Sequence, residues 1–127
     1  MKLRGVALVA LLAAFPLLLN AQTVIPKVNA EISFDFQISG KVLPAGSYSF
    51  AANKDGVVTV TNLKSLQSFI ATVLTRLADI PGSEAAVVFD KVGNTYYLSE
   101  LHIPGIDGYH FTGAPGPHSH VRASGKK

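Results

Sequence analysis

The chain has 127 residues, with 11 Lys and Arg against 8 Asp and Glu, and it contains no cysteine. The absence of cysteine excludes a disulfide framework and thiol catalysis. Five of the basic residues lie at the two ends, in residues 1–4 and 122–127, so the middle of the chain is slightly acidic. Nucleic acid is therefore not an expected partner.

The N-terminus has the order of segments that is typical of a secretory signal peptide. Two basic residues in the first four precede an apolar run over residues 5–19, and the small residue Ala21 follows. An uncleaved membrane anchor is the alternative, but this run contains Pro16 and is shorter than the roughly 20 residues that a membrane span needs. The sequence therefore predicts a signal peptide over residues 1–21, cleavage near Ala21, and export to the periplasm or extracellular space, with no transmembrane segment in the mature chain.

Short segments with alternating apolar and polar residues follow, separated by turns, and this pattern predicts β-strands. Residues 68–77 are apolar on both faces, which favours a central strand, although a helix is the alternative. About six or seven short strands predict a single all-β domain over residues 22–112, either an antiparallel sandwich or a partly open barrel. The expected strands cover residues 28–38, 41–43, 47–52, 57–61, 68–77, 85–90 and 95–103.

One tight turn is expected at Pro44-Ala45-Gly46, between residues 41–43 and 47–52. Proline suits the second position of a type I turn, and a left-handed Gly46 would close a hairpin with a bulge. Beyond the turn, Tyr48 and Phe50 alternate with serines, so both rings are expected to point into the core.

The stretch Phe-Asp-Phe-x-Ile-x-Gly-Lys-x-Leu-Pro-Ala-Gly-x-Tyr over residues 34–48 is the most specific motif of the chain. With Val-Val-Phe at 87–89 and Tyr-Tyr-Leu-Ser-Glu at 96–100, it resembles a family of small exported bacterial β proteins of uncharacterised function. The resemblance covers most of residues 28–103 and implies a β fold and an export route. It implies no activity and no site residue.

Histidines are the candidates for metal binding. His118 and His120 form a His-x-His pair, and His110 and His102 lie upstream, so the four could bind Zn, Cu or Ni through neutral imidazoles. No acidic residue follows His120 to complete the site. The sequence instead predicts that residues 113–127, rich in Gly, Pro, His and basic residues, form a flexible solvated tail, and metal binding by these histidines is the alternative.

No catalytic constellation is recognised. Tyr96, Leu98, Glu100 and His102 are expected on one face of the last strand, so Glu100 and His102 could form an acid–base pair, but two such residues on a strand are more often a surface ladder. Ser99 is expected on the opposite face, away from His102, so no nucleophile and base pair up.

The sequence thus predicts an exported small β domain that is not an enzyme and has no cofactor, acting as a binding module or as a structural module associated with the cell envelope. One alternative is a carrier that holds a small apolar ligand in a barrel cavity. The other is a metal-binding protein that uses the C-terminal histidines.

Overall fold

The structure is a computed structural model that describes residues 25–53 and 56–127; the predicted signal peptide lies outside the described residues. All regular structure in the described part is β, which confirms the predicted fold class, and no helix there could cross a membrane. The eleven strands are β1 Lys27–Ile32, β2 Phe36–Ile38, β3 Lys41–Leu43, β4 Gly46–Ala52, β5 Val57–Asn62, β6 Ser68–Thr72, β7 Thr75–Leu77, β8 Ala86–Val92, β9 Thr95–His102, β10 Gly108–His110 and β11 Ser119–Lys126.

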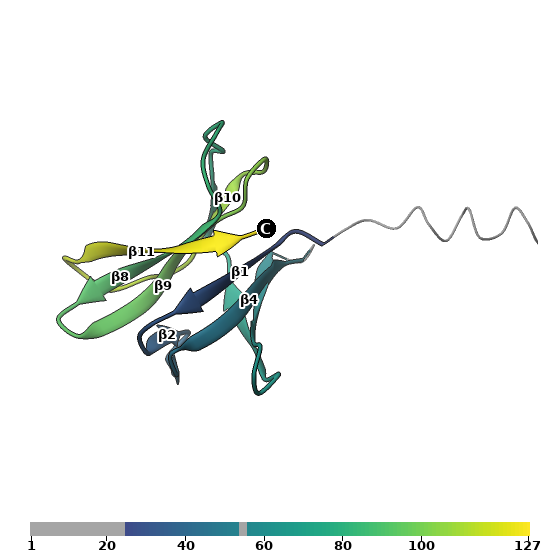
Figure 1. The fold of residues 1–127 in the computed structure, drawn as a ribbon. Helices are drawn as coiled ribbons and strands as arrows, with labels where there is room; N and C mark the ends of the chain where they lie inside the picture. Colours follow the sequence, from purple (N-terminus) through teal and green to yellow (C-terminus); the bar gives the residue numbers. More distant parts are fainter. Residues whose placement is uncertain (1–24, 54–55) are drawn as a thin grey trace, which may run out of the picture.

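The strands form one strongly curled open sheet, which corresponds to the partly open barrel rather than to a two-sheet sandwich (Figure 1). Nine strands follow the order β3-β2-β9-β8-β11-β1-β4-β5-β6, and β10 joins β7 to β9 beside this path. All pairings are antiparallel except that between β2 and β9. Curling lets the apolar faces of strands far apart in this order meet in a common core.

In the first strands, the buried residues are those that the alternating pattern of the sequence predicts. Val28, Ala30 and Ile32 of β1 are buried, and Tyr48 and Phe50 of β4 have no exposed surface. Val58 and Val60 of β5, Phe36 of β2 and Phe89 of β8 complete the centre of this core.

The predicted hairpin between residues 41–43 and 47–52 is wrong. β3 pairs with β2, and the turn between them has positive φ at Ser39 (51°) and Gly40 (82°), as a type I′ hairpin requires. Gly46 has φ 158°, close to extended, so the predicted left-handed conformation is also wrong. Pro44-Ala45 instead carries the chain from β3 at one end of the sheet to β4, which pairs with β1 and β5.

Hydrogen bonds hold this crossing in place. The carboxylate of Asp35 accepts a hydrogen bond from the Ala45 amide at 2.9 Å, and the Tyr48 hydroxyl donates one to the Pro44 carbonyl at 2.6 Å. Burial raises the pKa of the Tyr48 phenol, and the nearby Asp35 charge adds to the rise, while a hydrogen bond with Asn62 opposes both. The residues of the motif over 34–48 therefore build the architecture of the domain.

The predicted central strand over residues 68–77 is divided in two, and this prediction is also wrong. β6 ends at Thr72 and lies at the free end of the sheet, while β7 pairs with β10. Ile70 and Leu74 are 62% and 59% exposed, respectively. The prediction of a central strand assumed that apolar residues on both faces are buried, and these two residues are not.

The C-terminal residues are not a flexible tail, contrary to the prediction for residues 113–127. β11 (residues 119–126) lies between β8 and β1 (Figure 1). It forms six register pairs with β8, from Ser119 opposite Lys91 to Ser124 opposite Ala86. The prediction rested on amino-acid composition, but backbone hydrogen bonds to two neighbouring strands can hold a strand that has few apolar side chains.

β9 contains an irregularity that changes which residues share a face. Val88 pairs with Glu100 but Phe89 pairs with Leu98, so Ser99 is an extra residue in the ladder. Leu98 and Leu101 are both buried as a result, and the expected common face of Tyr96, Leu98, Glu100 and His102 is wrong. Tyr96 stacks on Phe34 at 3.8 Å between ring centroids, whereas Glu100 and His102 remain together.

Candidate metal centre

The pairing of β8 with β11 creates a cluster of one carboxylate and two imidazoles. His120 lies directly opposite Asp90 in the ladder, and His118 precedes the strand by one residue. The segment before β11 folds back over Asp90, so that the Ala114 amide donates a hydrogen bond to Asp90 Oδ2 at 3.0 Å. Gly113 lies so close that a Cβ atom there would collide with the same oxygen. Asp90 is consequently only 3% exposed.

The second oxygen of this carboxylate faces the two imidazoles. Asp90 Oδ1 lies 3.3 Å from His118 Nε2 and 3.2 Å from His120 Nδ1. Neither contact has the geometry of a hydrogen bond, and Oδ1 is buried without a hydrogen-bond partner. A buried carboxylate oxygen in that condition costs free energy, and native structures contain few of them. The cluster therefore calls for a further group between these three atoms.

The separations match those of ligands around one small cation. Nitrogen and oxygen ligands lie about 2.0–2.2 Å from zinc in a tetrahedral site, which puts neighbouring ligand atoms roughly 3.3–3.5 Å apart. In such a site the lone pairs point at the ion rather than at each other, so the ligand atoms approach without hydrogen bonding. The three atoms of Asp90, His118 and His120 all lie within 4.8 Å of one another.

The orientation of His118 also suits ligation. Its Nδ1 lies 2.8 Å from the Gly116 carbonyl oxygen, and because a carbonyl oxygen only accepts, Nδ1 carries the proton in this hydrogen bond. The lone pair is then on Nε2, the atom that faces Asp90. A hydrogen bond from the remote ring nitrogen to a carbonyl is the usual support of a metal-bound histidine. The side chains of His118 and His120 are 28% and 59% exposed, so the cluster is open to solvent.

The other two predicted histidines lie elsewhere. His102 Nε2 is 2.7 Å from Glu100 Oε1, and His110 of β10 lies opposite Glu100 in the ladder. Among residues 25–53 and 56–127, the group of three that could hold an ion consists of Asp90, His118 and His120. The four histidines predicted from the sequence are therefore divided, and two of them join the candidate centre.

Asp90 is the ligand that the sequence analysis missed. The expected acid was sought downstream of His120, where the sequence has none. A signal was available, because Asp90 ends a run of apolar residues over 85–89 that reads as a buried strand. A carboxylate placed in such a strand needs a partner, and an antiparallel neighbour supplies one without any fixed spacing in sequence.

Other hollows of the described residues lie outside the candidate centre. Core side chains fill the inside of the curled sheet. A cleft of about 270 Å³ lies where β2 approaches β6, and its lining includes Gln37, Thr72 and Tyr97 beside apolar groups. This mixed lining is unlike the apolar cavity of a carrier.

Comparison with known proteins does not add to this picture: no protein-family profile, no curated protein and no solved structure matches the chain significantly. The candidate centre therefore rests on its own geometry.

Proposed function

We propose that this protein binds a divalent transition-metal ion through Asp90 Oδ1, His118 Nε2 and His120 Nδ1. The single observation that supports the proposal most is the buried, unpaired Asp90 Oδ1 at ligand-to-ligand distance from two imidazole nitrogens. A bound cation would satisfy that oxygen and would use the free lone pair of His118.

The donor set favours particular ions. Two imidazoles and one carboxylate suit Zn²⁺, Cu²⁺ or Ni²⁺, whereas Ca²⁺ and Mg²⁺ prefer sites made of oxygen ligands. Three protein ligands leave at least one position of a tetrahedral ion to water or to another small donor. We take zinc as the reference ion, because the distances between zinc and its nitrogen and oxygen ligands fit the separations from Asp90 Oδ1 to the two imidazole nitrogens.

The proposed role is binding rather than catalysis, in an exported protein. Export is supported by the basic start, the apolar run over residues 5–19 and Ala21. Mass spectrometry of the protein from its native host should find a chain that begins near Gln22. Recovery of the intact N-terminus in the membrane fraction would contradict export, but it would leave the metal proposal in place.

Titration calorimetry on the chain starting at Gln22 tests metal binding. Zinc should bind with one ion per chain, and Mg²⁺ should not compete. His118→Ala and His120→Ala should each weaken zinc binding at least tenfold, because each removes one of three ligands. His102→Ala and His110→Ala are matched controls from the same sheet and should change the affinity less than twofold. Equal losses from all four variants, or no binding, would refute the assignment.

A further inference from the structure

β11 occupies a central place in the sheet but contributes no buried side chain. Its residues alternate between exposed and half-buried along its whole length. The neighbouring β8 has five successive buried residues, Ala86 to Asp90. Burial of apolar side chains is the main stabilising contribution to most strands, so β11 depends on backbone hydrogen bonds to an unusual degree.

The backbone pairing of β11 is itself one-sided near the candidate centre. Residues 119–124 pair with β8, whereas pairing with β1 is confined to Lys126 opposite Asn29 and Gly125 opposite Ala30. The start of the strand therefore has β8 as its partner in the ladder and has no pairing with β1. The segment before the strand is a loop, as its glycines and prolines favour: Gly113, Pro115, Gly116 and Pro117.

The candidate centre joins this weakly held start to β8. Asp90 belongs to β8, while His118 and His120 belong to the beginning of β11 and the residue before it. Without a metal ion, the contact leaves a buried carboxylate oxygen beside two imidazoles with no hydrogen bond, so neutral imidazoles contribute little to holding the strand. With a cation, the same three atoms become bonded through one ion, and the strand is attached where its pairing is weakest.

We propose that the metal ion is a latch for the C-terminal strand: occupancy of the Asp90–His118–His120 site keeps β11 docked, and loss of the ion lets it leave the sheet. This proposal rests on the proposed metal binding and adds its consequence. Departure of β11 would expose the unpaired edges of β8 and β1, which is a change in surface large enough for a partner to sense. Whether β11 is docked or released would then depend on whether the metal ion is available.

Trypsin provides a direct test, because Arg122 lies within β11 and Arg76 lies within β7, which pairs with β10 and not with β11. Proteolysis in a strand requires that strand to open, so cleavage after Arg122 reports release of β11, and cleavage after Arg76 reports opening of a part of the sheet that does not pair with β11. Relative to the chelator-treated protein, saturating zinc should slow cleavage after Arg122 at least tenfold and leave the Arg76 rate nearly unchanged.

Two variants make the outcomes distinct. His120→Ala should be cleaved quickly after Arg122 with and without zinc, whereas His102→Ala should behave as the parent protein. If calorimetry detects zinc but Arg122 cleavage is equally slow in both states, the latch is wrong and metal binding stands. If calorimetry detects no zinc, both proposals fail. Parallel slowing at Arg122 and Arg76 would show general stabilisation and would also overturn the latch.

Discussion

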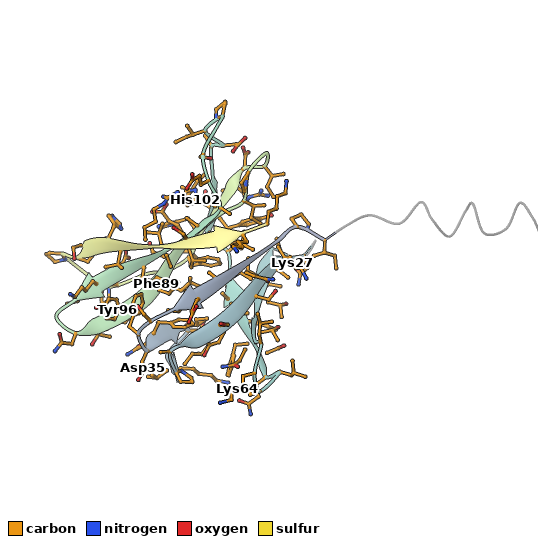
Figure 2. The ribbon with its side chains drawn as sticks, viewed as in Figure 1. Lys27, Asp35, Lys64, Phe89, Tyr96 and His102 are labelled. Carbon is orange, nitrogen blue, oxygen red and sulfur yellow. The ribbon has the colours of Figure 1, made fainter. Side chains whose placement is uncertain are left out.

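The protein brings imidazole and carboxylate together in two places, and the two differ in burial. The Glu100–His102 pair is solvated, with both side chains 24% exposed and a contact of 2.7 Å that has hydrogen-bond geometry. The Asp90 cluster has a carboxylate that is 5% exposed, two imidazoles and longer contacts without hydrogen bonds. Figure 2 shows His102 near the β10 end of the molecule, well away from Lys64 at the opposite end.

The difference teaches that residue types alone do not define a metal site. A solvated pair such as Glu100 and His102 satisfies itself and gains little from an ion, since water already solvates its unused atoms. The buried cluster at Asp90 differs, because the Gly113–Ala114 segment covers Oδ2 while Oδ1 has no hydrogen-bond partner. Desolvation without a partner is what makes the second group a candidate centre.

The largest expected effect is on zinc affinity. Asp90→Ala removes the single anionic ligand and should weaken zinc binding at least 100-fold, or about 2.7 kcal/mol. Glu100→Ala removes the corresponding carboxylate of the solvated pair and should change the affinity less than twofold. Calorimetry on both variants checks this, with circular dichroism to confirm that each is folded. A larger loss from Glu100→Ala would move the metal site to β9.

A smaller effect is expected from the segment that covers Asp90. Gly113 and Gly116 have φ 67° and 73°, so alanine is strained at either position. A Cβ at Gly113 would collide with the Asp90 carboxylate, whereas a Cβ at Gly116 meets no atom within 4 Å. Gly113→Ala should therefore weaken zinc binding roughly tenfold, or about 1.4 kcal/mol, and Gly116→Ala should not. Equal affinities of the two variants would mean that the cover does not position the ligand.

In the metal-free protein, a substitution at Asp90 should increase the free energy of unfolding. Asp90→Asn keeps an oxygen for the Ala114 amide and gives the imidazoles an NH₂ donor in place of the unpaired oxygen. At pH 8 this variant should be more stable than the parent by about 0.5–1.5 kcal/mol. Glu100→Gln, in the solvated pair, should change stability by less than about 0.5 kcal/mol. Urea unfolding in chelator measures both, and destabilisation by Asp90→Asn would show that Oδ1 has a partner.

The buried Tyr48 hydroxyl, unlike Asp90 Oδ1, has a hydrogen-bond partner and sharpens the comparison. Because burial raises its pKa above the ordinary 10.0, the folded state holds the phenol proton more tightly than the unfolded state does. Its contribution to stability should be complete below pH 10 and should fall as the pH rises further. In urea unfolding between pH 8 and pH 11, Tyr48→Phe should lose part of the alkaline slope. An unchanged slope would contradict the assignment to this phenol.

The sequence predicts the part of the fold that local patterns control. Alternation identifies β1, β4 and β5 and their inward residues, and the two strands expected over residues 85–90 and 95–103 form the antiparallel pair β8–β9. The failures involve pairing between distant segments. Nothing local in Ser-His-Val-Arg-Ala-Ser-Gly-Lys reveals that β8 and β1 leave a place for a strand.

The same limit applied to the candidate centre. His118 and His120 could be found from their spacing, because alternate residues of a strand share a face. Asp90 could not be joined to them, because the pairing of β8 with β11 is a property of the whole sheet. The sequence places Asp90 at the end of an expected buried strand, but its unpaired oxygen beside two imidazoles exists only once the chain has folded.

The position of the ion is the most direct test of the central claim. Crystals of the chain starting at Gln22, grown with zinc, should be measured on both sides of the zinc absorption edge. The account predicts one anomalous peak about 2.0–2.2 Å from Asp90 Oδ1, His118 Nε2 and His120 Nδ1. A peak bound by His102 and Glu100, or an absent peak beside an ordered Asp90 whose Oδ1 accepts hydrogen bonds from both imidazoles, would contradict it.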